Sequence, residues 1–206
     1  MFIYFCYNIY GDNMGKLYFK YGAMGCGKTT ELLQVVYNYQ KNGYNVLLIK
    51  PEVDKKGEDT VVSRIGASKK VDLLIKSDDK ISEMIDFEKT DAIVVDEAQF
   101  LNENQVKELW IMSKIYDVPV IAYGLKVNFL GELFEGSKAL IEKADKIDEL
   151  ATICSCSKKA KFNVRIVNGE YASSGDVVSI DGIDSEYEVM CPECYIKKVL
   201  KIDIKK

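Results

Sequence analysis

Short apolar runs alternate with longer amphipathic stretches between residues 16 and 150. The apolar runs have the length of buried strands and span residues 16–21, 45–50, 71–76, 91–96 and 118–123. The amphipathic stretches have helical spacing and cover residues 28–40, 79–89 and 102–116, with Asn102 as the cap of the last helix. Residues 52–69 are polar, contain two glycines and are expected to form a loop. Strands that alternate with helices predict an open, mostly parallel sheet with helices on both faces.

The hydrophobic pattern changes near residue 151. Two alternating segments, residues 161–167 and 176–180, are accompanied by the turn pairs Asn168-Gly169 and Ser174-Gly175. This pattern predicts a small β-rich unit after the α/β part of the chain. We therefore expect an N-terminal extension over residues 1–13, an α/β domain over 14–150 and a second domain over 151–206.

The composition is that of a globular protein without a surplus of basic charge. Of 206 residues, 48% are hydrophobic and 29% are charged, with a formal net charge of -4 and a pI near 5.1. Nucleic-acid-binding modules concentrate basic charge, so this balance argues against a nucleic-acid partner. No apolar run reaches the ~18 residues that suggest a membrane span, so no membrane partner is expected either.

The first thirteen residues, MFIYFCYNIYGDN, are aromatic and apolar. They lack the basic segment and the small-residue cleavage site of a secretion signal, which favours an added N-terminal arm over a signal. Translation from Met14 is a further alternative. The expected location of the protein is the cytoplasm.

Residues 22–29 match the pattern G-x-x-x-x-G-K-[ST] of a phosphate-binding loop. The loop consists of Gly22, Ala23, Met24, Gly25, Cys26, Gly27, Lys28 and Thr29. Backbone N–H groups of such a loop bind phosphate oxygens, while Lys28 is expected to reach the β- and γ-phosphates and Thr29 to ligate Mg²⁺. The pattern follows a predicted strand and opens a predicted helix, which favours a nucleotide site over an ordinary glycine turn.

Two acids stand at the end of the apolar run over residues 91–96. Asp96 is predicted to hold the Mg²⁺ shell, and Glu97 follows where a carboxylate can take a proton from water or from a substrate hydroxyl. The chain contains no histidine, the commonest acid–base side chain near neutral pH. Glu97 is therefore the leading candidate for a general base, with two surface acids of no special role as the alternative.

Four cysteines fall in the second domain as a C-x-C pair and a C-P-E-C pair, namely Cys154, Cys156, Cys191 and Cys194. Two close pairs brought together by a hairpin suit a structural Zn²⁺ site. Two disulfides or four free thiols are the alternatives, and a reducing compartment favours zinc. Cys26 is interpreted as a small spacer in the glycine loop that is sensitive to oxidation.

Three classes of nucleotide-binding protein compete with a metabolite kinase. A switch GTPase needs an N-K-x-D motif, which is absent, and a helicase needs a second motor domain for which the chain is too short. A zinc ribbon that binds nucleic acid would need a basic surface, yet residues 151–206 contain nine basic and eight acidic side chains. A kinase that acts on a small hydroxyl compound is the best interpretation of the residues.

An ordered set of motifs supports a more specific identification. The motifs are GAMGCGKTTELL, DEAQF, AYGLKVNFLGELFEGS, TICSC and YEVMCPECY. In this order they resemble type II thymidine kinases, and in particular a bacterial member, from about Met14 to the C-terminus. The resemblance implies ATP-dependent phosphorylation of the 5′-hydroxyl of thymidine, and of deoxyuridine, to give dTMP in the case of thymidine. The expected fold is an α/β P-loop NTPase of the RecA-like type with a small zinc-binding domain that carries a lasso loop.

The resemblance also assigns roles to individual residues. Glu97 matches the catalytic base, and Asp96, Ala98 and Gln99 match ATP-binding positions together with the glycine loop. The expected substrate contacts are Met24, Arg64, Phe100, Leu125, Phe129, Phe134 and Tyr187. A core role for the phenylalanines, a plain strand position for Tyr187 and a surface position for Arg64 are the alternatives. A homotetramer and inhibition by dTTP are further implications.

Four positions depart from the family pattern. Cys194 stands where many relatives have histidine as the last zinc ligand, and four thiolates still form a sound site. Asn128 and Leu130 replace an acid and a glutamine, which puts hydrogen bonding to substrate in question. Asp181 replaces a lasso glycine and is expected to alter loop closure.

Overall fold

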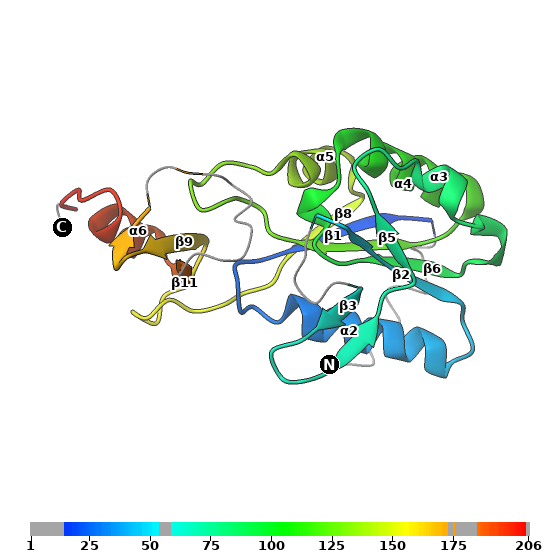
Figure 1. Cartoon of the computed structure of the whole chain (residues 1–206), viewed down its shortest axis with the longest axis horizontal. Helices are drawn as coiled ribbons and strands as arrows, with labels where there is room; N and C mark the ends of the chain where they lie inside the picture. The colour runs from blue at the N-terminus through cyan, green and yellow to red at the C-terminus, as the bar shows by residue number, and fades with distance from the viewer. Residues whose placement is uncertain (1–14, 54–58, 173–174, 176–184, 205–206) are drawn as a thin grey trace.

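A six-stranded parallel sheet forms the centre of the α/β domain. The computed structural model describes residues 15–53, 59–172, 175 and 185–204. The strands lie in the order β5-β2-β6-β7-β1-β8, and each neighbouring pair is parallel. Their bounds are Leu17–Tyr21 (β1), Val46–Pro51 (β2), Leu73–Ile75 (β5), Ala92–Val95 (β6), Val120–Gly124 (β7) and Lys146–Glu149 (β8). The predicted parallel sheet is confirmed, with β8 as an edge strand that the apolar pattern did not indicate (Figure 1).

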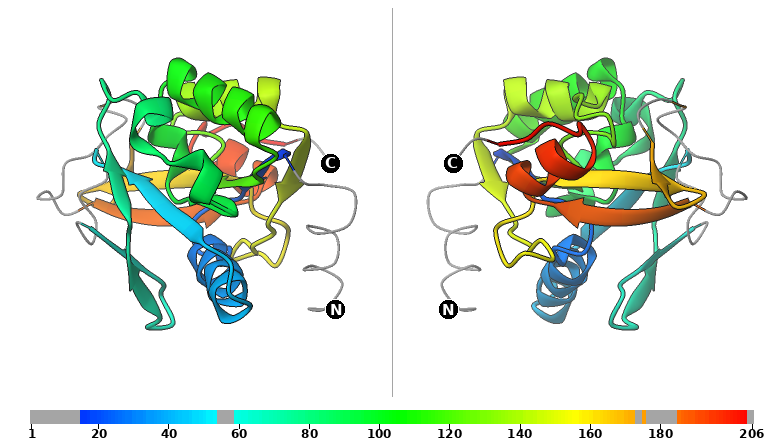
Figure 2. Two further views of the ribbon diagram at one scale, coloured as in Figure 1. Left: turned by 90° about the vertical axis from the view of Figure 1, so that its right-hand side faces the viewer. Right: turned by 90° about the vertical axis from the view of Figure 1, so that its left-hand side faces the viewer.

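Helices cover both faces of this sheet (Figures 1 and 2). Helix α2 packs on one face, and α3, α4 and α5 pack on the other. Their bounds are Lys28–Lys41 (α2), Ile81–Met84 (α3), Glu103–Tyr116 (α4) and Glu135–Lys143 (α5). Because the sheet is covered twice, every residue of β6 and β7 is buried, and this burial explains their continuous apolar runs. None of the described helices is long and apolar enough to cross a membrane.

Helix α4 begins where the sequence predicts. The side chain of Asn102 accepts a hydrogen bond from the Gln105 N–H at 2.9 Å, and the Gln105 side chain accepts one from the Asn102 N–H at 3.2 Å. This reciprocal capping box satisfies two N–H groups that the first turn leaves unpaired. The helix ends at Asp117, which adopts a left-handed backbone with φ of 56°.

The loop expected over residues 52–69 instead contains an antiparallel hairpin. It is formed by β3 (Thr60–Val62) and β4 (Ser68–Lys70). Val61 is 2% exposed and packs in the core on the α2 face of the sheet, which anchors the hairpin. The prediction was wrong here because each strand has only three residues, and Val61 is the one residue of the two strands that is buried.

The prediction of a single helix over residues 79–89 was also wrong. The chain forms only the four-residue α3 and the 3-10 turn η1 (Phe87–Lys89), with extended backbone at Ile85 between them. Ile81, Ile85 and Phe87 all enter the core. An unbroken helix cannot bring residues 85 and 87 to the same face, so the helix ends early.

A second, antiparallel sheet follows the α/β domain. Its order is β10-β9-β11, and its elements are β9 (Phe162–Val167), β10 (Glu170–Tyr171), β11 (Ser185–Met190) and the following helix α6 (Pro192–Lys198). Asn168 and Gly169 both have positive φ, 51° and 78°, as a two-residue hairpin turn requires. The strand predicted over residues 161–167 is confirmed. The strand predicted over 176–180 and the extension over 1–13 lie outside the described residues.

Candidate functional site

The glycine loop joins β1 to α2 at the carboxyl edge of the parallel sheet. Gly25 and Gly27 have φ of 75° and 86°, a region that suits glycine and strains other residues. Gly22 is enclosed, because a Cβ added there would lie 2.4 Å from a backbone carbonyl oxygen. The Nζ of Lys28 donates to the carbonyl oxygens of Gly22 at 3.0 Å and Ala23 at 3.2 Å. The loop is therefore tightly turned, with its lysine lying across it.

A cavity of about 300 Å³ opens beside this loop. Four segments line it: the loop with the start of α2, the turn of the β3–β4 hairpin, the residues after β6 and the residue after β7. The sequence-predicted residues in the lining are Met24, Gly25, Gly27, Lys28, Thr29, Arg64, Glu97, Gln99, Phe100 and Leu125. Phosphate-binding groups, the proposed base and several expected substrate contacts thus face one space.

Glu97 is held by a buried glutamine. The Gln99 Nε2 donates to Glu97 Oε2 at 2.6 Å, and Gln99 Oε1 accepts from the Leu125 N–H at 2.9 Å. Gln99 is 2% exposed, and a Cβ added to Gly124 would lie 2.7 Å from its Oε1. The bridge orients a carboxylate whose own backbone is left-handed, with φ of 48°. The sequence predicts an ATP contact for Gln99 but gives no signal of this bridge or of the need for Gly124.

Arg64 reaches the glycine loop from the turn between β3 and β4. The Ser63 N–H donates to the Ala67 carbonyl at 2.8 Å, and the Ser63 Oγ accepts from the Ala67 N–H at 3.1 Å, which closes the turn. A Cβ added to Gly25 would lie 3.3 Å from the Arg64 Nη1. The guanidinium therefore lies against the phosphate loop, where it can pair with an anion.

The expected aromatic contacts occupy different surroundings. Phe100 lines the cavity and meets Phe134, the N-cap residue of α5, edge to face with centroids 5.7 Å apart. Phe129 is buried, and the guanidinium carbon of Arg165 lies 5.7 Å from its ring centroid. Tyr187 is a half-exposed residue of β11. Of these four aromatic residues, Phe100 is the one that lines the cavity beside the glycine loop.

The departures from the family pattern differ in their consequences. The Asn128 Oδ1 accepts hydrogen bonds from the N–H groups of Leu130 at 2.9 Å and Glu132 at 3.0 Å. Its side-chain oxygen therefore folds its own loop. Asp181 lies outside the described residues.

The acid predicted for the magnesium shell lies at the carboxyl end of β6. Asp96 is 6% exposed, and its N–H donates to the Ile49 carbonyl of β2 at 3.0 Å. Thr29 lines the cavity at the start of α2. A hydroxyl and a carboxylate are oxygen donors of the kind that Mg²⁺ takes.

The four second-domain cysteines form one cluster. Their sulfur atoms lie within 4.8 Å of one another, and the Cys156 and Cys191 sulfurs are 3.5 Å apart. Backbone N–H groups of Cys156 and Cys191 lower the pKa of Cys154 to about 6, whereas hydrogen bonds to the neighbouring sulfurs raise the pKa of Cys194 to about 12. Four thiolates cannot coexist here without a cation, so the cluster fits a metal ion. All described cysteines are free thiols, which removes the disulfide alternative for this cluster.

An ion pair between a buried lysine and a partly buried glutamate, which the sequence did not indicate, joins β1 to α2. The Lys20 Nζ of β1 is 2.6 Å from the Glu31 Oε1 in the first turn of α2, and the Tyr123 hydroxyl donates to the same oxygen at 3.3 Å. Burial and the nearby Glu31 raise the pKa of Tyr123 well above its usual value. This network joins β1, through Lys20, and β7, through Tyr123, to the first turn of α2, the helix that follows the phosphate loop.

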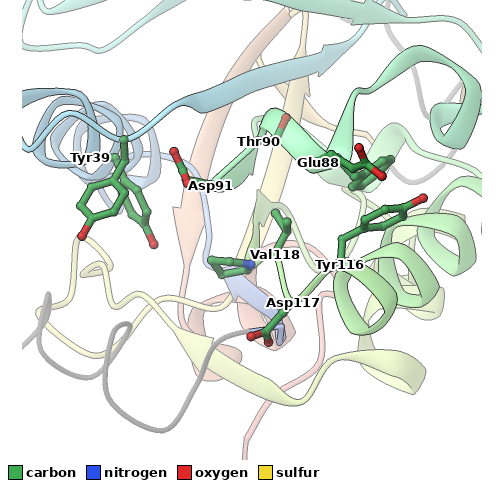
Figure 3. Close-up of a pocket in the computed structure, with 10 residues that line it drawn as sticks. Tyr39, Glu88, Thr90, Asp91, Tyr116, Asp117 and Val118 are labelled. Carbon is green, nitrogen blue, oxygen red and sulfur yellow. The ribbon is translucent and has the colours of Figure 1, made fainter.

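A second cavity, of about 340 Å³, lies at the amino ends of β6 and β7 (Figure 3). Its wall includes the carboxylates of Glu88, Asp91 and Asp117 beside the rings of Tyr39 and Tyr116. None of the predicted site residues lines it, and its described lining contains no Lys or Arg. It lies at the sheet edge opposite the glycine loop and is unsuited to a phosphate group.

Comparisons with known proteins agree with this geometry. The family model described as thymidine kinase matches residues 15–195. The thymidine kinase of Pasteurella multocida is 41% identical over 191 residues, which cover 90% of this chain and 99% of that protein. The thymidine kinase of Vibrio cholerae is 42% identical over 88% of this chain and 97% of its own length. Among solved structures, the AMPPCP-bound DnaA of Aquifex aeolicus aligns with a TM-score of 0.44 at 19% identity, over 72% of this chain and 45% of that one, which is too distant to bear on function. The chain belongs to the thymidine kinase family and is a nucleoside kinase.

Proposed function

We propose that the cavity beside the glycine loop transfers the γ-phosphoryl group of ATP to the 5′-hydroxyl of thymidine, and of deoxyuridine. The observation that supports this reaction is the position of Glu97, which lies in one cavity with Lys28 and Thr29. A base on the acceptor side and phosphate ligands on the donor side are the two halves that a kinase site needs.

In this mechanism the acceptor hydroxyl attacks the γ-phosphorus in line with the leaving group. As the new P–O bond forms, the bond to the β-phosphate oxygen breaks, ADP leaves and the hydroxyl proton passes to Glu97. Lys28 and the backbone N–H groups of the loop stabilise charge on the phosphates, and Arg64 contributes from the opposite side. Thr29 and Asp96 would hold Mg²⁺, which supplies further positive charge when bound.

The nucleoside lies on the Met24 and Phe100 side of the cavity. A planar base can stack on the ring of Phe100, while Leu125 limits the space beside it. Phe134 packs edge to face on Phe100 and supports this wall, while Phe129 and Tyr187 are proposed as substrate contacts on the family resemblance alone.

Zinc is the metal that best suits the cysteine cluster. Tetrahedral Zn²⁺ with Zn–S bonds of about 2.3 Å places its sulfur ligands about 3.8 Å apart. The four sulfurs here, all within 4.8 Å of one another, can reach that arrangement with small side-chain movements. Cys154, Cys156, Cys191 and Cys194 would then hold a structural ion that joins the start of β9 to the end of β11.

The family resemblance supports three further proposals. The enzyme is a cytoplasmic homotetramer, and dTTP, the end product of the pathway that the reaction feeds, inhibits it. Light scattering coupled to size exclusion would give a mass four times that of the 23.3 kDa chain. A dTTP titration of initial rate would reveal the inhibition, and a monomer or an unaffected rate would contradict the corresponding proposal.

The reaction is tested by transfer of labelled phosphate from ATP to a panel of nucleosides. We expect thymidine and deoxyuridine to be labelled and other nucleosides to be poor acceptors. Glu97→Gln should reduce turnover by roughly 10²- to 10⁴-fold while ADP still binds, because it removes the base and retains the fold. ATP hydrolysis stimulated by RNA or DNA, with no nucleoside labelled, would instead support the helicase alternative.

A further inference from the structure

A buried asparagine of the second domain contacts the phosphate loop of the first. The Asn163 Oδ1 accepts a hydrogen bond from the Met24 N–H at 2.7 Å, although the two residues are 139 positions apart. Asn163 is 4% exposed, so its side chain is largely removed from water. In Figure 1, β9 and β11 lie beyond the carboxyl edge of the parallel sheet, on the side of the loop that joins β1 to α2.

The bonded N–H belongs to the loop residue that precedes the two left-handed glycines. Gly25 and Gly27 turn the chain after Met24, so fixing the Met24 amide sets the direction from which the phosphate-binding segment starts. Met24 also lines the cavity together with Glu97 and Phe100. The hydrogen bond that Asn163 accepts therefore fixes a residue that belongs to the phosphate loop and also lines the cavity with the candidate base.

The strand that carries Asn163 is fixed by the cysteine cluster. Phe162 pairs with Met190 and Asn163 pairs with Val189 in the β9–β11 ladder. Cys191 directly follows β11, while Cys154 and Cys156 precede β9 and form the same cluster. Asn163 thus lies one residue from the end of the ladder that the cluster closes, and its position depends on that closure.

A second contact comes from the same face of β9. Residues two apart on a strand point to the same side, and Arg165 lies with its guanidinium carbon 5.7 Å from the ring of Phe129. This face of β9 therefore touches the glycine loop through Asn163 and the loop after β7 through Arg165.

We propose that Asn163 is a positioning residue that sets Met24, and with it the phosphate loop, in register with the second domain. The proposal rests on the kinase function given above. It adds a residue whose side-chain oxygen bonds the Met24 N–H and contacts neither substrate. Without the bond, the Met24 peptide group could adopt several orientations, and the phosphate loop would be less well ordered. Both substrates would then bind more weakly.

The test compares Asn163→Leu, which removes the acceptor at similar size, with Val164→Ala as a matched control. Val164 is fully buried on the other face of the same strand, so its truncation weakens the second domain without touching Met24. For Asn163→Leu we expect the KM for thymidine and the Kd for Mg-ADP to rise about three- to tenfold, the range for one hydrogen bond. Val164→Ala should lower the melting temperature and leave both constants within about twofold of wild type.

Two further variants complete the design. Asn163→Asp keeps the acceptor oxygen, and because thymidine is uncharged its KM should return to the wild-type range. If Asn163→Leu yields no folded protein, Asn163→Ala removes the same acceptor and is judged by the same constants. Metal content is measured for every variant and should match wild type.

Three results would overturn the proposal: unchanged constants in folded Asn163→Leu, an equal rise in Val164→Ala, or a thymidine KM in Asn163→Asp as high as in Asn163→Leu. A wild-type protein that phosphorylates no nucleoside would refute the proposed function instead. In that case Mg-ADP binding by calorimetry still reports whether Asn163 positions the phosphate loop.

Discussion

Replacing Gln99 by methionine should reduce turnover while the nucleotide still binds. The change removes the Nε2 that donates to Glu97 at 2.6 Å and the Oε1 that accepts from the Leu125 N–H, at nearly constant volume. A buried hydrogen bond to a charged group contributes about 1.5–3 kcal/mol, so kcat should fall roughly 10- to 150-fold if that bond holds the carboxylate in the transition state. The Leu125 N–H left without its acceptor should lower the free energy of unfolding by about 1–3 kcal/mol. Steady-state transfer from ATP to thymidine and chemical unfolding measure the two effects.

Gln105→Met provides the matched control for Gln99→Met. Gln105 is also a buried glutamine, and its Nε2 donates to the carbonyl oxygens of Lys76 at 2.7 Å and Asp79 at 3.1 Å, away from the cavity. Its replacement should cost a similar free energy of unfolding and leave kcat of the folded protein unchanged. A Gln99→Met enzyme with wild-type kcat, or a Gln105→Met enzyme that loses as much, would refute the reasoning that Gln99 orients Glu97.

Three further predictions concern stability. The double change of Cys191 and Cys194 to Ser should lower metal content, measured by elemental analysis, together with the melting temperature, whereas Cys26→Ser should retain the metal; wild-type protein without zinc would contradict the site. Gly136→Ala places a Cβ 2.6 Å from carbonyl oxygens of the segment after β6, and it should cost about 1–3 kcal/mol in urea unfolding; an unchanged midpoint would show that this contact relaxes freely. Burial opposes ionisation of Asp145, but bonds from the Lys114 ammonium and the Leu17 N–H lower its pKa below the usual 3.8. Its contribution is therefore full above pH ~4 and disappears as pH falls through the lowered value, so the stability gap between wild type and Asp145→Asn should narrow on acidification; a gap independent of pH would refute the assignment.

Burial on both faces made the central strands predictable. β1, β2, β6 and β7 read as continuous apolar runs because helices cover the sheet twice, and their predicted bounds agree within two residues. The edge strand β8, with sequence KIDE, has mostly exposed side chains and therefore carries no such run. The β3–β4 hairpin was not predicted for a related reason, since Val61 is the one residue of its two strands that is buried in the core.

The placement of Lys28 and Glu97 in one cavity was predictable because both lie in continuous motifs. The glycine loop follows β1 and Glu97 follows β6, and parallel strands bring their carboxyl ends to one edge, so two motifs far apart in sequence had to meet. The absence of histidine narrowed the choice of base further. These inferences need only local sequence patterns and the parallel direction of the strands in the sheet.

The contacts that orient those residues follow a different rule. Gln99 bonds the Leu125 N–H and Asn163 bonds the Met24 N–H, and the partners are 26 and 139 residues apart. An asparagine or a glutamine can bond almost any backbone group, so the sequence does not state which partner the fold selects. Gly124 is a further example, because a Cβ there would lie 2.7 Å from the Gln99 side-chain oxygen and 3.1 Å from the Gln99 backbone nitrogen. The contacts that hold the candidate site residues in place, within residues 14–150 for Gln99 and between Met24 and Asn163 for the second unit, are therefore visible only in the folded chain.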